Sequence, residues 1–399
     1  MTTPETESAV GTTTPAAKYN YAIGYLRAFV VVLVVAHHAV LAYHPFAPPP
    51  PASLAAQPRW WQAFPVVDPQ RWSGATLLAG FNDVFFMSLM FFLSGLFVWH
   101  GLQGKGAANF LRGRLLRLGV PFVLSAALLA PLAYYPSYLQ LPTHTGFWTQ
   151  WLALGQWPAG PAWFIWVLLA FDTIATLLFL AAPRWGESLG RRLPARPVTL
   201  FLALLAATAL VYIPLAVRFS PMMWSAFGPF TFQTSRILHY LVYFLLGIGV
   251  GAFGVERGLF APDGKLARRW PLWVASAVVL FGLAAAVTIV AVTSQLQSLA
   301  WAVAMDAGFV ISCGASCFAF LAVFLRFARS RSSWFDSLSA NSYGIYLVHY
   351  AFVSWLQYAL LPAALPGAAK FAIVLLGAVG LSWGTTAVLR RSSTVRRVV

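Results

Sequence analysis

The sequence predicts an all-α, polytopic membrane protein with about ten transmembrane helices in one bundle. Of its 399 residues, 60% are hydrophobic and only 9% are charged. Apolar runs of about twenty residues, the length that crosses a hydrocarbon core, recur as far as the C-terminus. The basic residues collect in alternate connecting segments, as the positive-inside rule requires. Together these observations exclude a soluble globular protein.

The apolar runs place the expected spans along the chain. They cover residues 21–43, 76–99, 117–136, 163–182, 198–217, 235–253, 271–293, 299–325, 341–361 and 370–389. With a cytoplasmic N-terminus, most of the 26 lysines and arginines lie on the cytoplasmic side. Those on or near the other side are Arg59, Arg71, Arg218, Arg236 and Lys370. We therefore predict a multi-pass protein of the cell (inner) membrane, with both termini cytoplasmic.

The segments outside the spans give three domain predictions. Residues 1–19 are rich in Thr, Pro and Ala and lack the basic start of a signal peptide, which predicts a disordered cytoplasmic tail. Residues 20–390 form the integral membrane domain, and residues 391–399 form a basic cytoplasmic tail. The net charge of +16 follows the topology, so no nucleic-acid partner is expected. Cys313 and Cys317 cannot build a disulfide framework or a metal quartet, and no metal is expected.

The first span carries an unusual pair of polar residues, Arg27 and His38. Eleven positions bring both side chains to within about 20° of one direction, about 16 Å apart along the helix. Ionisable groups inside a span are costly, which favours a functional reading of both. The alternatives are that Arg27 extends to the lipid headgroups and that His38 is a hydrogen-bonded histidine of the bundle. His37 points about 80° away and is expected to be a packing residue.

Basic and acidic residues near the second and third spans suggest further site residues. Asp83 is a candidate to orient a histidine on a neighbouring helix, or else is an interfacial carboxylate. Arg112, Arg114 and Arg117 precede Pro121 at the expected start of the third span. Guanidinium groups pair bidentately with phosphate, so this cluster suits an anionic ligand. Positive-inside topology alone also predicts basic residues here.

Later spans add candidates that face a substrate. Trp163 stands at the start of the fourth span, behind the turn at Gly160 and Pro161. Arg236 and Tyr240 open the sixth span and are expected to face an outer vestibule. His349 lies on the aromatic-lined ninth span, where a structural role is the alternative. The outer loops 44–75 and 137–162 are rich in Trp and Pro, which interfacial anchoring explains and sugar stacking would also suit.

In combination, these residues resemble the membrane-bound acyltransferase family 3, which contains bacterial O-acyltransferases of surface glycans. The resemblance covers most of residues 20–390. It rests on the Arg-x10-His pair of Arg27 and His38, and on four further motifs in the expected order. These are the segments 91–95 (FFLSG), Arg114-x-x-Arg117 before Pro121, 160–164 (GPAWF) and 342–349 (SYGIYLVH). The run 87–95 and the segment 233–236 (QTSR) look most like the branch of periplasmic-glucan succinyltransferases.

The resemblance implies transfer of an acyl group, acetyl or succinyl, from cytoplasmic acyl-CoA to a hydroxyl of an extracytoplasmic glycan. It implies His38 as general base, with an acyl-histidine intermediate as the less favoured variant. Arg27 would position the donor, and Arg112, Arg114 and Arg117 would bind its phosphates. The lipid bilayer and the glycan acceptor are the expected partners. A transporter or flippase for a glycan or lipid is the alternative, with the intramembrane acids and histidines as its polar path.

Overall fold

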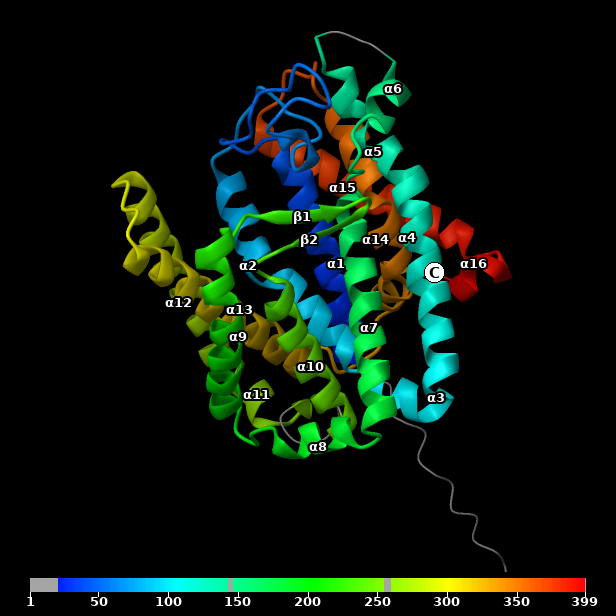
Figure 1. Cartoon of the computed structure of the whole chain (residues 1–399), viewed down its shortest axis with the longest axis vertical. Helices are drawn as coiled ribbons and strands as arrows, with labels where there is room; N and C mark the ends of the chain where they lie inside the picture. Colours follow the sequence, from blue (N-terminus) through cyan, green and yellow to red (C-terminus); the bar gives the residue numbers. More distant parts are fainter. Residues whose placement is uncertain (1–20, 143–145, 255–259, 399) are drawn as a thin grey trace, which may run out of the picture.

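The computed structural model describes residues 21–142, 146–254 and 260–398, and within them the chain is almost entirely helical (Figure 1). The predicted tail at residues 1–19 lies outside the described residues. In chain order the elements are α1 (Tyr21–Leu41), η1 (Trp60–Gln62), α2 (Gly74–Gly95), α3 (Val98–Arg114), η2 (Leu115–Gly119), α4 (Val120–Leu124), η3 (Ser125–Leu129), α5 (Ala130–Leu139), α6 (Phe147–Leu152), η4 (Gly160–Ala162), α7 (Trp163–Ala181), α8 (Trp185–Arg192), α9 (Pro197–Phe219), β1 (Trp224–Phe227), β2 (Phe230–Gln233), α10 (Ile237–Phe253), α11 (Lys265–Arg268), α12 (Trp270–Thr293), α13 (Leu299–Phe327), α14 (Ser333–Ala359), α15 (Gly367–Leu389) and α16 (Ser393–Val398).

The predicted all-α polytopic fold is confirmed. In the described ranges, 8 helical segments are long and apolar enough to cross a membrane. Two further predicted spans coincide with α10, an apolar helix of 17 residues, and with α14, which has 27 residues and more polar side chains. The hairpin of β1 and β2 is an exception that the sequence analysis did not expect. Its antiparallel register pairs Trp224 with Gln233 and Phe227 with Phe230.

The third predicted span, 117–136, is only part of one long helical segment. This segment runs from Val98 to Leu139 and has 42 residues, so it extends well beyond a bilayer core. Two π-helical turns, η2 and η3, interrupt its α-helical hydrogen bonding. Each π turn has i→i+5 bonding and shifts the direction of the following side chains, and such turns are frequent at functional sites. Pro121, Pro131 and Pro136 lie in the same segment.

The bundle has an inner group of helices and an outer one. The apolar stretches of α1, α2 and α13 are mostly buried, whereas those of α12, α15 and α9 have few buried residues. The exposed side chains on the outer helices include large apolar ones such as Val278, Leu283 and Leu376. Water would penalise such surfaces, so these helices face lipid. The candidates Arg27 and His38 on α1 and Asp83 on α2 lie on the inner group.

Glycines bring α2 and α10 into direct backbone contact. A Cβ atom on Gly95 would collide with the carbonyl oxygen of Phe244, and one on Gly247 would collide with that of Phe92. Gly251 meets the carbonyl of Leu96 in the same way. Small residues at such positions allow transmembrane helices to pack closely. The segment Ser94-Gly95 therefore has a packing role.

The loop between α1 and α2 and residues 153–159 form a cap with α5 and α6 at one end of the bundle (top of Figure 1). Trp61, Tyr134 and Trp151 pack together at its centre. Lys370, at the start of α15, reaches this cap and contacts Asp68 with Nζ–Oδ2 at 2.7 Å, both side chains being fully buried. Removing either partner of such a buried pair would leave the other charge buried without compensation, which is strongly destabilising. The ion pair therefore links the cap to the bundle.

Candidate functional site

Helix α1 carries Arg27 and His38, and α14 holds it along its whole length. Near the start of α1, the Tyr25 hydroxyl donates to Oδ1 of Asp336 at 2.6 Å. One turn further along α14, the Ser339 hydroxyl donates to the carbonyl of Gly24 at 3.1 Å. Near the other end, Nε2 of Gln357 donates to the carbonyl of His38 at 2.9 Å. These bonds fix the rotation and the height of α1 relative to α14.

His38 lies beside two residues of α14, His349 and Tyr350. The ring centroids of His38 and His349 are 5.4 Å apart, and those of His38 and Tyr350 are 4.8 Å apart. Nδ1 of His349 is 2.7 Å from the carbonyl oxygen of Tyr346, which can only accept, so this nitrogen carries the proton. The name "His38 site" is used below for His38, His349 and Tyr350.

Each histidine of the His38 site keeps a ring nitrogen without a hydrogen-bond partner among the described residues. In His349 this nitrogen is Nε2, and the side chain is fully buried. In His38 it is Nδ1. Buried polar atoms are normally paired, so these unpaired nitrogens are unusual; Nδ1 of His37 and Nδ1 of His239 are unpaired among the described residues as well. Such a nitrogen can accept a proton from a substrate hydroxyl.

His37 has different neighbours. Its ring packs against Phe86 on α2 with centroids 5.1 Å apart, and its electrostatic neighbours include Asp83 and Arg236. The electrostatic neighbours of His38 are His349 and His37. Asp83 therefore lies toward His37, and no described contact joins it to His38. The assignment of Asp83 to a catalytic role remains a prediction.

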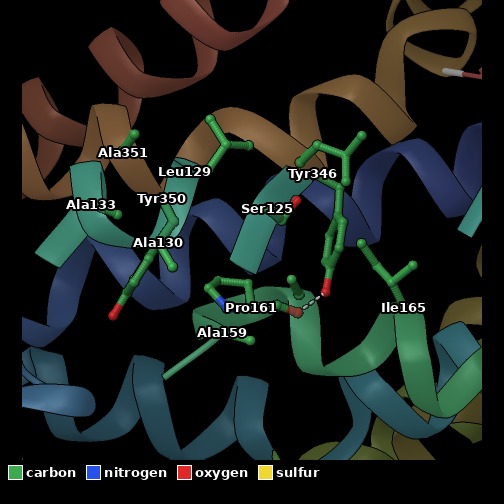
Figure 2. A pocket seen from close by; sticks show the side chains of 12 residues that line it. Ser125, Leu129, Ala130, Ala133, Ala159, Pro161, Ile165, Tyr346, Tyr350 and Ala351 are labelled. Carbon is green, nitrogen blue, oxygen red and sulfur yellow. Dashed lines mark hydrogen bonds between the residues drawn. The ribbon is translucent and has the colours of Figure 1, made fainter. Parts of the chain in front are cut away.

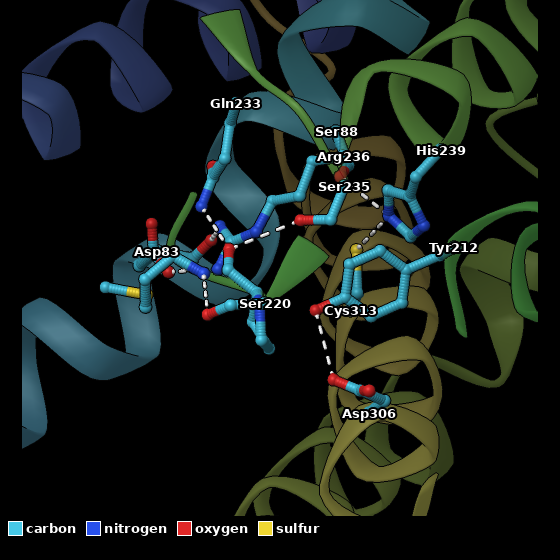
Figure 3. Close-up of polar contacts among 12 residues, drawn as sticks. Asp83, Ser88, Tyr212, Ser220, Gln233, Ser235, Arg236, His239, Asp306 and Cys313 are labelled. Carbon is cyan, nitrogen blue, oxygen red and sulfur yellow. Dashed lines mark hydrogen bonds and ion pairs between the residues drawn. The ribbon is translucent and has the colours of Figure 1, made fainter. Parts of the chain in front are cut away.

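Asp83 pairs with Arg236 in a second polar group, shown in Figure 3. Nη2 of Arg236 is 2.7 Å from Oδ2 of Asp83, and the guanidinium carbon lies 4.5 Å from the ring centre of Phe309. Only 4% of Arg236 is exposed, so it does not face an open vestibule. Tyr240 is also buried and stacks on Phe91 at 5.1 Å. The buried charge of Arg236 is thus compensated by Asp83, whose side chain is 40% exposed.

The same group continues to His239 and Cys313, which the sequence analysis did not single out. Nε2 of His239 is 3.2 Å from the Ser88 hydroxyl and 3.5 Å from the Cys313 sulfur. Further along, the Tyr212 hydroxyl donates to Asp306 at 3.4 Å. Within the described ranges, no group of three or more His, Cys, Asp or Glu side chains is arranged to hold a metal ion. These contacts give the intramembrane polar residues hydrogen-bond partners.

The three arginines before Pro121 have three different environments. Nε of Arg114 lies 3.1 Å from Oδ2 of Asp172, whose side chain is fully buried on α7. Arg117, beyond the start of the π turn η2, is exposed and donates to the carbonyl of Arg397 on α16 at 3.3 Å. Arg112 is exposed. Arg114 thus compensates the charge of Asp172 in the middle of its span, whereas Arg112 and Arg117 remain accessible.

Arg27 lines a cleft where three arginines from distant parts of the chain meet. Its volume is about 510 Å³, and it is lined by Arg27, Arg331 and Arg390 together with Tyr21, Asp336, Ser339 and Ala340. We call it the Arg27 cleft. Arg331 and Arg390 come from the loop before α14 and from the end of α15, and no sequence spacing connects them to α1. Tyr343, one turn further along α14, contacts the backbone of Arg117.

The described chain is a multi-pass helical bundle with unpaired imidazoles in its interior and a cleft lined by three arginines, which defines a polytopic membrane protein. The family model described as an acyltransferase domain matches residues 20–387, so the chain belongs to acyltransferase family 3. The resemblance inferred from the motifs is confirmed at the level of this family, as is the acyltransferase class of enzyme. A search of curated proteins gave no match, and a search of solved structures gave none.

Proposed function

We propose that this enzyme transfers an acyl group from cytoplasmic acyl-CoA to a hydroxyl of an extracytoplasmic glycan, with His38 as the general base. The observation that carries the proposal is the arrangement of α1. Its first turns place Arg27 in a cleft of arginines, and its last turns place His38 beside a second unpaired imidazole. One rigid helix thus connects a phosphate-binding surface to a proton acceptor about 16 Å further along the axis.

The chemistry at the His38 site requires one proton transfer in each direction. His38 removes the proton of the acceptor hydroxyl as its oxygen attacks the thioester carbonyl carbon. The new carbon–oxygen bond forms, the carbon–sulfur bond breaks, and the imidazolium returns its proton to the departing CoA thiolate. A neutral imidazole suits this role, because its ordinary pKa is near neutrality. In His349, Nδ1 donates its proton to the carbonyl oxygen of Tyr346. Its Nε2 therefore carries no proton and can accept one beside His38.

The donor's phosphates would bind at the Arg27 cleft, which the positive-inside rule predicts to lie on the cytoplasmic side. Arg27 and Arg390 supply guanidinium groups suited to bidentate phosphate contacts, whereas Nε of Arg331 is paired with Oδ2 of Asp336 at 2.6 Å and leaves its other nitrogens for a phosphate. The exposed Arg112 and Arg117 could extend this surface along α14. Arg114 differs from them, since its partner Asp172 is buried, and we assign it to holding α3 and α7 together.

The acceptor would approach from the cap, where aromatic side chains are exposed. Trp60 is 54% exposed and Trp148 is 59% exposed. Aromatic rings of this kind stack on sugar faces. Trp163 is half-buried against Trp224 of the hairpin, so a direct contact with the acceptor remains a prediction for it. The same holds for Arg236 and Tyr240. The family assignment favours this enzymatic function over a transporter or flippase.

The test is acyl transfer by the purified protein in lipid vesicles. Release of free CoA thiol would be followed with acetyl-CoA as donor, and acylated glycan would be detected by mass spectrometry. We expect thiol release that depends on added glycan and is lost in His38→Ala. Glycan movement across the vesicle membrane without any thioester consumption would instead support the transporter alternative.

A further inference from the structure

A small cavity lies behind the His38 site, between the helical segment η3–α5, the turn η4 and α14 (Figure 2). Its volume is about 20 Å³. Five of its 12 lining residues are alanines from three segments: Ala130, Ala133, Ala159, Ala162 and Ala351. We call it the alanine pocket. Its side chains are mostly buried, and Leu129, Leu347 and Ala351 at one margin are half-buried.

The pocket is separated from the histidines by single aromatic rings. Tyr350 forms part of its wall and packs edge-on against His38. Tyr346 forms another part and lies 5.9 Å from His349, measured between ring centroids. Tyr350 is therefore the side chain between this space and His38, and an acyl group bound next to His38 would pass along the Tyr350 ring to reach it.

The walls of the pocket are held in place by specific contacts. The Tyr346 hydroxyl donates to the carbonyl of Pro161, which fixes α14 to η4 (Figure 2). Gly160 has φ of 56°, a left-handed conformation that favours glycine, and a Cβ there would lie 3.2 Å from the Tyr350 ring. The π turn η3 contributes Ser125 and Leu129 to the opposite wall. The space is thus part of a rigid framework.

Size and charge restrict what this pocket can hold. A single water requires about 10–15 Å³ on the same measure, so about 20 Å³ has room for one or two small groups. None of the 12 lining residues carries a formal charge. A carboxylate placed there would lose its hydration without gaining a cationic partner, which is unfavourable. A methyl group satisfies both conditions, because it is small and uncharged.

We propose that the alanine pocket binds the acyl tail of the donor and selects a short, uncharged acyl group such as acetyl over butyryl or succinyl. This inference rests on the proposed acyltransferase function and deepens it. It distinguishes between acetyl and succinyl, the two acyl groups that the family resemblance allows. The residues that set chain length are the alanines of η3–α5 and α14, with Leu129 and Leu347 as limiting side chains.

The experiment compares kcat/KM for acetyl-, butyryl- and succinyl-CoA by CoA thiol release, using full-length enzyme in lipid vesicles with glycan acceptor. Pockets of this kind discriminate about 10–200-fold per methylene. We expect wild type to prefer acetyl-CoA by about 100-fold or more over both longer donors. Leu347→Ala should raise the butyryl-to-acetyl ratio at least about 10-fold, and Ala133→Leu should lower acetyl turnover by a similar factor.

Matched controls separate the pocket from general effects on the helices. Val348→Ala changes the next residue of α14, and Ala127→Leu changes an exposed position of η3; neither residue lines the pocket. Both should keep the wild-type preference. If acyl-CoA is consumed but Leu347→Ala leaves the butyryl-to-acetyl ratio unchanged, or wild type uses succinyl-CoA as well as acetyl-CoA, the pocket proposal is wrong. If wild type consumes no acyl-CoA at all, the proposed function and this inference both fall.

Discussion

Tyr350 packs edge-on against His38, with ring centroids 4.8 Å apart and an angle of 69° between the ring planes. The same tyrosine lines the alanine pocket and contacts Tyr134 of α5. It therefore joins the histidine of α1 to the long helical segment that bears the π turns. This contact depends on α14 lying directly beside α1, an arrangement that their hydrogen bonds maintain from Gly24 to His38.

The first prediction distinguishes the two neighbouring histidines. His38→Ala should reduce acyl transfer by about 10²–10⁴-fold, the usual effect of removing a general base. His37→Ala should retain a substantial part of the activity, because His37 packs on Phe86 and lies outside the His38 site. Initial rates of CoA release would be compared at equal amounts of folded, monodisperse protein. An inactive His37→Ala together with an active His38→Ala would reverse the assignment.

The second prediction concerns the Arg114–Asp172 ion pair. Arg114→Ala should destabilise the protein by about 3–5 kcal/mol, because it leaves the buried Asp172 carboxylate without a partner. Arg114→Ala combined with Asp172→Asn should recover most of this loss. Thermal unfolding in detergent measures the effect, with the exposed Arg117→Ala as a control that should change stability by less than about 0.5 kcal/mol. Equal destabilisation in the single and double variants would show that Asp172 does not need Arg114.

The third prediction tests the Arg27 cleft as a donor site. Arg390→Ala should weaken acyl-CoA binding by about 10-fold or more, since a charge-assisted hydrogen bond contributes about 1.5–3 kcal/mol. The loss should shrink at high salt, because the cleft is open to solvent. Isothermal titration with CoA itself measures affinity without turnover. Arg326→Ala, an exposed arginine outside the cleft, serves as the control. Unchanged affinity in Arg390→Ala would exclude Arg390 from the donor site.

The sequence predicted the spans because length, hydrophobicity and charge are local properties. It also placed Arg27 and His38 on one helix, since helical periodicity alone determines that relation. It could not show that His349 faces His38 or that Arg331 and Arg390 join Arg27, because these contacts depend on which helices pack together. The π turn at Leu115–Gly119 had no recognisable local signal. For that reason, Arg114 and Arg117 were treated as members of one cluster in the sequence analysis, whereas the two have different surroundings.

The last prediction concerns the orientation of the bundle, which determines whether the Arg27 cleft can meet cytoplasmic acyl-CoA. Both native cysteines are buried, so single introduced cysteines should give a clear signal. Ala55→Cys lies on an exposed part of the cap, and Ser330→Cys lies on the exposed connection beside Arg331. An impermeant maleimide added to intact cells should label Ala55→Cys but should label Ser330→Cys only after lysis. The expected asymmetry follows from the basic residues in alternate connections. Labelling of Ser330→Cys from outside would place the arginine cleft on the wrong side for a cytoplasmic donor.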